Sequence, residues 1–164
     1  SATTLLASKA KAPRPETGPK VGGKAPDIEF FTLPKGAKET LSQYSGKVVA
    51  LEFWASWCGP CQAPMEKMQT YRKKNPQWGD DVKLIAVSID NTKDKALAHL
   101  EKKGWKETHN VWAGDGGFRA KAPTAYEVRG IPSMFIIDKD GKIARKGHPG
   151  SLDTPAIING LLKK

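Results

Sequence analysis

The chain has 164 residues and a formal net charge of +10, from 27 Lys or Arg against 17 Asp or Glu. This length is typical of one domain with a core of ordinary size, and no apolar run approaches the roughly 20 residues of a membrane-spanning helix. The two cysteines, Cys58 and Cys61, lie three positions apart, which excludes a scaffold held together by many disulfides. With only three scattered histidines as further ligands, a tetrahedral zinc site is strongly disfavoured.

The first 26 residues differ in composition from the rest of the chain. They hold five basic residues against one acidic residue and are rich in Ala and Pro. Such a segment buries too little apolar surface to offset the entropy of ordering, so we interpret 1–26 as a flexible linker and 27–164 as the domain. Because the chain starts with Ser, we expect either a removed targeting segment or anchor, or an artificial end. The first reading favours an extracytoplasmic location (periplasm or secretory space) or an organelle lumen, with the cytoplasm as the alternative.

The first elements after the linker alternate between strands and a helix. Residues 28–33 form a short strand candidate, and 47–54 and 82–90 are apolar runs typical of strands covered on both faces of a sheet. Between these runs, 58–75 has a helical pattern. Pro64 lies inside that pattern and predicts a kink.

The second half of the domain continues the alternation and then changes to a hairpin. We expect helices over 91–104 and 152–164, a weak helix over 118–128, a short strand near 109–113, and hairpin strands over 133–138 and 142–147. An Asp-Gly pair between the last two strands is a strong hairpin signal. The order predicts an α/β fold in which a mixed central sheet is flanked by helices.

One motif, Trp57-Cys58-Gly59-Pro60-Cys61, lies where a predicted buried strand leads into a helix. A cysteine at a helix N-terminus faces unpaired N–H groups and the positive end of the dipole, and both favour the reactive thiolate. Pro60 falls in the first turn, where its missing N–H costs nothing. We interpret Cys58 as the nucleophile, Cys61 as the resolving thiol and Trp57 as an apolar contact for partners. The alternatives are two ordinary core residues or half a metal site.

Two segments resemble the thioredoxin superfamily. EFWASWCGPC is similar to the active-site strand and turn of thioredoxins, and RGIPS (129–133) resembles the family's loop that ends in a cis-proline beside the disulfide. The order of elements also matches over about 27–164. The resemblance implies a thioredoxin fold with an N-terminal strand extension and an insertion at 105–126 before the cis-proline strand. These additions are more similar to TlpA/ResA-like or nucleoredoxin/tryparedoxin-like members than to a minimal thioredoxin.

The same resemblance implies a substrate site around the cysteines. A cis Ile131–Pro132 bond would present the backbone of Ile131 to an extended substrate, which could pair with it through main-chain hydrogen bonds. Trp57, Gly59 and Pro60 would complete this substrate-binding surface. The alternative for Pro132 is a proline that simply starts a strand.

Glu52 is a charged residue in the middle of the run VVALEFW. If that strand is covered on both faces, desolvation raises the pKa of its carboxyl group. In thioredoxins a buried acid at the matching position accepts the proton of the resolving cysteine, so the resemblance implies this role for Glu52 towards Cys61, through water. The lysine that partners this acid in thioredoxins is replaced here by Ala86. The alternative is a Glu that reaches solvent along the strand.

These residues predict a thiol–disulfide oxidoreductase that reduces protein disulfides by dithiol exchange, without metal or organic cofactor. We expect a monomer that acts on disulfide-containing proteins and is re-reduced by a thiol reductase or a membrane electron donor. No nucleic-acid motif accompanies the basic charge, so we expect no nucleic-acid partner. The rival functions are a thiol peroxidase, a copper chaperone of the same fold, and a redox-inactive binding or scaffold module.

Overall fold

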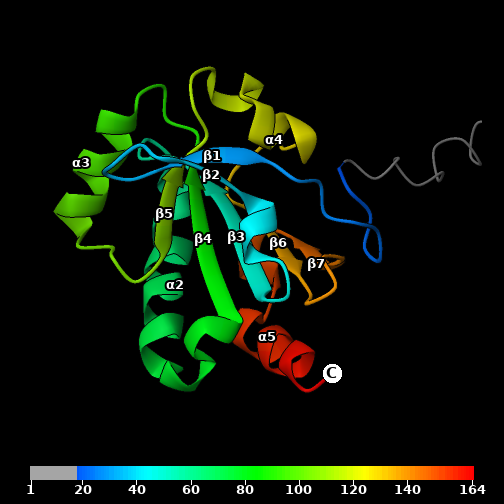
Figure 1. Ribbon diagram of the computed structural model, residues 1–164. Coiled ribbons are helices and arrows are strands. Elements are labelled where there is room, and N and C mark those ends of the chain that lie inside the picture. The colour runs from blue at the N-terminus through cyan, green and yellow to red at the C-terminus, as the bar shows by residue number, and fades with distance from the viewer. Residues whose placement is uncertain (1–17) are drawn as a thin grey trace, which may run out of the picture.

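A seven-stranded mixed sheet forms the centre of the computed structural model, which describes residues 18–164 (Figure 1). The strands are β1 (Glu29–Thr32), β2 (Lys38–Thr40), β3 (Val48–Trp54), β4 (Val82–Ser88), β5 (His109–Trp112), β6 (Ser133–Ile137) and β7 (Ile143–Gly147). Their spatial order is β2-β1-β5-β4-β3-β6-β7. Strands β3, β4 and β5 run parallel, and the strands on either side of them are antiparallel. The predicted mixed sheet is confirmed.

The helices are α2 (Gln62–Lys74), α3 (Lys93–Lys103), α4 (Lys121–Ala125) and α5 (Thr154–Leu162). Short 3₁₀ turns occupy Leu41–Tyr44, Gly59–Cys61, Pro76–Asp81, Gly117–Arg119 and Pro149–Ser151. Two of these helices begin with a side-chain cap. Thr92 accepts a hydrogen bond from the backbone N–H of Lys95 at the start of α3, and Asp153 accepts one from Ala156 at the start of α5. Gly104 ends α3 in the left-handed conformation that glycine adopts without strain.

The two faces of the sheet are covered by different helices. Side chains alternate along a strand, and on one face Ala50 of β3 packs in a cluster with Met68 of α2 and Ile158 of α5. On the other face the ring of Phe53 meets that of Tyr126, which follows α4, at 5.8 Å between centroids. Figure 1 shows the same division, with α4 above the sheet and away from α2 and α5. All seven residues of β3 are buried, so this strand is the centre of the core.

Two features differ from the sequence-based expectation. Strand β2 was not predicted, because its three residues, KET, carry no apolar alternation; it pairs only with β1, at the edge of the sheet. The kink expected at Pro64 assumed that this residue lies in the interior of the helix. That assumption was wrong, because Pro64 is the third residue of α2. In the first turn of a helix a missing N–H breaks no intrahelical hydrogen bond.

The segment 18–26, which the sequence assigned to the linker, lies against the domain. The N–H of Gly22 donates to the carbonyl of Ile143, and the N–H of Ile143 donates to the carbonyl of Gly23, at 2.7 and 2.9 Å. The hydroxyl of Tyr126 donates to the carbonyl of Pro26 at 2.7 Å. The remainder of the predicted linker, 1–17, lies outside the described residues. Within 18–164, no helix has the length and apolar character needed to cross a membrane.

Candidate active site

Cys58 and Cys61 form a disulfide at the start of α2, with 5.3 Å between their Cα atoms. The 3₁₀ turn Gly59–Cys61 leads directly into the helix, and Pro60 lies within it. This placement agrees with the sequence-based expectation of a cysteine pair at a helix N-terminus. The two sulfurs differ in access: Cys58 is 4% exposed, whereas Cys61 has no exposed surface. An incoming group therefore reaches Cys58 first.

The Ile131–Pro132 peptide bond is cis, as predicted. Residues 131 and 132 precede β6, which pairs antiparallel with β3, so the sheet carries this loop to the cysteines. The Sγ of Cys58 lies 3.7 Å from the carbonyl oxygen of Ile131. The backbone of Ile131 therefore borders the reacting sulfur.

Trp57 projects from the same corner of the molecule and is 60% exposed. Its ring approaches only that of Phe118, with 6.4 Å between centroids, among the ring pairs within 18–164. An indole this open offers a partner a large apolar surface next to the disulfide.

Glu52 is completely buried in β3, between Ala86 of β4 and Met134 of β6 in the register of the sheet. Neither carboxyl oxygen has a hydrogen-bond partner among the described residues. Desolvation raises the pKa of Glu52 from 4.5 to about 8. The alternative of a side chain that reaches solvent is wrong, and the neighbour Ala86 supplies no cation to offset the burial.

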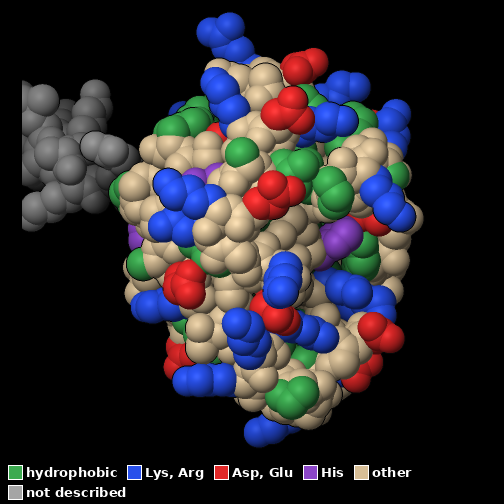
Figure 2. Space-filling view, turned by 90° about the vertical axis from the view of Figure 1, so that its left-hand side faces the viewer, with side chains coloured by type: hydrophobic (Ala, Val, Ile, Leu, Met, Phe, Trp, Pro, Cys, Tyr) green, Lys and Arg blue, Asp and Glu red, His purple; other side chains and the backbone are tan. Residues whose placement is uncertain are grey.

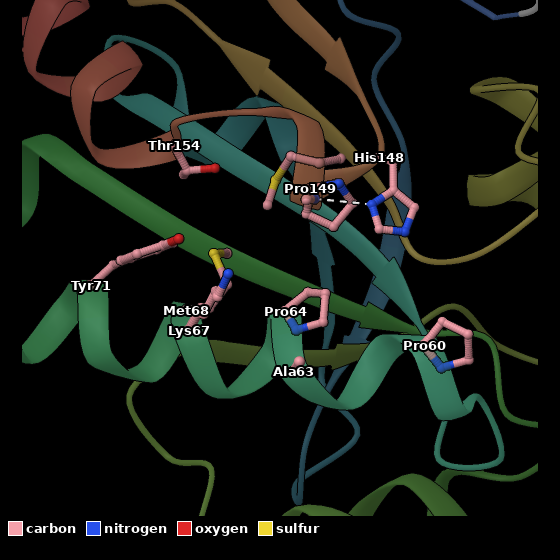
Figure 3. Close-up of a pocket in the computed structure, with 11 residues that line it drawn as sticks. Pro60, Ala63, Pro64, Lys67, Met68, Tyr71, His148, Pro149 and Thr154 are labelled. Atoms are coloured by element: carbon pink, nitrogen blue, oxygen red, sulfur yellow. Dashed lines mark hydrogen bonds between the residues drawn. The ribbon is translucent and has the colours of Figure 1, made fainter.

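A cavity of about 240 Å³ opens beside the active site, between α2 and the turn before α5 (Figure 3). Met68 and Met134 line it from inside, and Pro60 lines it next to the cysteines. Tyr71 lies at its far end, and burial raises the pKa of this phenol, with smaller contributions from Asp153 and Glu52. The cavity therefore reaches from the surface to the immediate neighbours of the buried carboxyl group.

Comparison with known proteins identifies the family. Residues 20–162 match the Redoxin family. The chain belongs to this family. It is 34% identical over 127 residues to the thiol-disulfide oxidoreductase ResA of Bacillus thuringiensis subsp. konkukian, covering 77% of this chain and 69% of the relative. It is 30% identical over 129 residues to the thioredoxin-like protein YneN of Bacillus subtilis, covering 78% and 71%.

A solved structure of similar fold supports the same assignment. A Chlorobium tepidum protein described as a thiol:disulfide interchange protein, DsbE, superposes with a TM-score of 0.70 at 28% identity, covering 90% of this chain and 98% of that one. Together these similarities confirm the thioredoxin fold and the TlpA/ResA-like resemblance. This Redoxin-family chain is a ResA-like thiol–disulfide oxidoreductase, and the comparisons do not favour a peroxidase or a redox-inactive module.

Sequence reasoning missed Asp90, a fully buried carboxylate that holds the active-site loop. Asp90 follows β4 and accepts hydrogen bonds from the backbone N–H and the hydroxyl of Ser56, at 3.0 and 2.5 Å. It accepts another from the hydroxyl of Ser88, at 2.6 Å. Its signal is an acid at the carboxyl end of a buried strand, where parallel neighbours bring their following loops together.

A second polar connection also went unpredicted. The side-chain amide of Gln62 donates to the carbonyl of Cys58 at 2.8 Å, and its oxygen lies 2.7 Å from Nε2 of His99 on α3. The ring of His99 packs on Trp54 and Trp105, with centroids 5.9 and 5.4 Å away. Helix α3 thus supports the backbone that carries the nucleophile. No cluster of three or more metal-ligating side chains occurs within the described 18–164.

Proposed function

We propose that the protein reduces disulfide bonds in protein substrates, with Cys58 as the attacking thiolate and Cys61 as the resolving thiol. The observation that carries this proposal is the difference between the two sulfurs. Cys58 lies next to the exposed Trp57 and the backbone of Ile131, whereas Cys61 has no exposed surface. A Gly-Pro pair between the cysteines also resembles reducing thioredoxins, whose potential is about −270 mV.

The exchange proceeds in two displacements. The Cys58 thiolate attacks one sulfur of the substrate disulfide, forming a mixed disulfide and releasing the other substrate sulfur as a thiolate. The Cys61 thiolate then attacks Cys58, which releases the second substrate thiolate and closes the Cys58–Cys61 disulfide. The protein loses two electrons and two protons, and the substrate gains them. A thiol reductase or a membrane electron donor must then supply two electrons to the protein.

In this proposal Glu52 takes the proton that Cys61 loses before the second displacement. The pKa of Glu52, about 8, lies close to the ordinary value of a cysteine thiol, about 8.5. A proton therefore moves between the two groups at little cost in free energy. The cavity lined by Met68 and Met134 supports the expected transfer through water, because it borders the neighbours of Glu52.

The substrate would lie over the surface formed by Trp57, Gly59 and Pro60 on one side and by Ile131 and Pro132 on the other. An extended segment placed there pairs with the Ile131 backbone through main-chain hydrogen bonds. This arrangement puts the substrate sulfur over Cys58 rather than over Cys61.

We further propose that the protein acts as a monomer outside the cytoplasm and has no nucleic-acid partner. On the face shown in Figure 2, Lys and Arg side chains are interspersed with Asp and Glu. This distribution does not resemble the continuous basic stripe expected for a nucleic-acid surface. Fractionation of the native cells, with a thiol-blocking step at lysis, tests the location.

The central test uses the reduced protein and an insulin-type protein disulfide. Cys58→Ser should abolish reduction, because no attacking thiolate remains. Cys61→Ser should retain the first displacement and accumulate mixed disulfides, which non-reducing gels and mass spectrometry detect. If Cys61 is alkylated faster than Cys58 at neutral pH, the two roles are reversed. Titration of the pair against glutathione buffers gives its redox potential and hence the favoured direction.

A further inference from the structure

A shallow depression lies beside the nucleophile, between the active-site loop and helix α3. Its volume is about 340 Å³, and it is lined by Ser56 and Trp57 from the loop and by Lys95, Ala98, His99 and Lys102 from the helix. Ser56 and Trp57 directly precede Cys58 in the chain, so the depression borders the loop that carries the reacting cysteine. The function described above uses Trp57 and the backbone of Ile131 and assigns no role to the α3 wall of this depression.

The depression carries positive charge. Lys95, His99 and Lys102 are spaced by four and three residues and therefore share one face of α3. Both lysines are exposed, and neither takes part in the two ion pairs found within 18–164. Burial lowers the pKa of His99, and Lys103 and Lys102 lower it further. The charge at neutral pH therefore comes from the lysines.

No exposed acid lines the depression. Asp90 lies beneath its Ser56 wall, but it has no exposed surface, and its oxygens accept hydrogen bonds from Ser56 and Ser88. The lysines are thus free to meet an anion from outside. Trp57 adds an apolar surface at the edge, 60% exposed.

We propose that this depression binds acidic side chains of the substrate protein, so that disulfides flanked by Asp or Glu are reduced preferentially. The inference rests on the proposed function and names its substrate class. Lys95 and Lys102 are separated by about 10 Å along the helix axis, at 1.5 Å per residue. Acids on the same side of an extended segment, two residues apart, lie about 7 Å from each other. The long lysine side chains make up the difference between these two spacings, so one such pair of acids can contact both lysines.

The experiment measures single turnovers of the reduced protein with three synthetic peptide disulfides. The peptides share one sequence around the disulfide and differ only in two flanking positions, which are Glu, Gln or Lys. Stopped-flow tryptophan fluorescence follows closure of the Cys58–Cys61 disulfide, so no electron donor is needed. The variants are Lys95→Gln with Lys102→Gln, and a matched control in which the exposed Lys73 and Lys74, at the far end of α2, are both changed to Gln.

We expect the Glu peptide to react about tenfold faster than the Lys peptide at low ionic strength, in the range of electrostatic steering by a few charges. This ratio should fall to near one in about 0.5 M salt, where the screening length is only a few ångströms. It should also fall to near one in the Lys95/Lys102 variant and stay high in the Lys73/Lys74 control.

Three outcomes would overturn the inference. The Glu and Lys peptides could react at equal rates with the wild type, the preference could survive loss of Lys95 and Lys102, or the control variant could lose it equally. Failure of the proposed function looks different, because then none of the peptides, the neutral one included, is reduced by the wild type.

Discussion

Two buried carboxyl groups lie on neighbouring parts of the sheet, one in β3 and one just after β4, and their surroundings are opposite. Glu52 and Asp90 both have no exposed surface. Asp90 accepts hydrogen bonds from Ser56 and Ser88, whereas neither oxygen of Glu52 has a partner among the described residues. Equal burial therefore does not imply the same role for the two acids. A buried acid with its hydrogen bonds satisfied holds a loop in place, and one without them is stabilised only by binding a proton.

The largest effect we expect comes from removing the satisfied carboxylate. Asp90→Ala leaves the N–H and hydroxyl of Ser56 and the hydroxyl of Ser88 without their acceptor in a buried site. The free energy of unfolding should fall by about 4 kcal/mol, since each charge-assisted hydrogen bond contributes about 1.5–3 kcal/mol. Urea unfolding measures this loss. Asp81→Asn, at an exposed acid, serves as the control and should change stability by less than about 0.5 kcal/mol.

If Asp90→Ala proves nearly neutral, the hydrogen bonds to Ser56 add little, and the contrast between the two acids loses its energetic basis. If the Asp90→Ala variant also reduces substrate at the wild-type rate, Asp90 does not position the active-site loop either.

A feature of the site could be predicted from the sequence when it depends on residues that are close together in the chain. The cysteine pair and Pro132 are identified by short motifs, and the burial of Glu52 follows from the apolar residues on both sides of it in one strand. The role of Asp90 depends on Ser56, 34 positions away, so it appears only when β3 and β4 are aligned side by side. No periodicity in the sequence encodes that contact.

The differences between the structure and the sequence-based expectation have the same origin. The composition of 18–26 is that of a linker, yet its backbone hydrogen-bonds to β7, and backbone pairing depends little on side-chain type. Strand β2 was missed for a similar reason, because it is held as an edge strand by β1. The Pro64 kink depended on where α2 begins, and the 3₁₀ turn Gly59–Cys61 moves that start from residue 58 to Gln62.

The unsatisfied carboxyl group should respond in the opposite direction from Asp90. Its pKa is about 8 in the folded protein and 4.5 in the reference state. Folding therefore favours the protonated form, so the linked stability is fully present below pH 4.5 and is lost as the pH rises towards 8. At pH 7 the loss is on the order of 3 kcal/mol, at about 1.4 kcal/mol per pH unit.

Glu52→Gln removes this titration. The variant and the wild type should have similar free energies of unfolding near pH 4, and the variant should become the more stable protein as the pH rises to 8. Urea unfolding at several pH values between 4 and 8 measures the divergence. Two parallel curves would mean that Glu52 is not a buried titrating group, and the contrast with Asp90 would disappear.

The same substitution should slow the reaction. Without a carboxylate to take its proton, Cys61 resolves the mixed disulfide more slowly, and general bases contribute about 10²-fold or more to such steps. Rapid-quench measurement of the mixed disulfide separates this step from the first attack, which should be little changed. A gain in stability combined with slower resolution is typical of a group kept for function. Unchanged resolution would make Glu52 a structural residue.

The smallest effect we expect comes from Asp90→Asn, which keeps the shape of the side chain and removes its charge. One amide oxygen can still accept from Ser56, so the loss of stability should be about 1–2 kcal/mol, well below that of Asp90→Ala. Removing a negative charge from beneath the Ser56-Trp57 loop should also favour the Cys58 thiolate, and the pH midpoint of Cys58 alkylation should move down by less than one unit. A merely structural role would leave that midpoint in place while stability falls. If the midpoint moves up instead, the dominant effect is loss of loop geometry around the helix N-terminus, and Asp90 acts on the nucleophile through position rather than through charge.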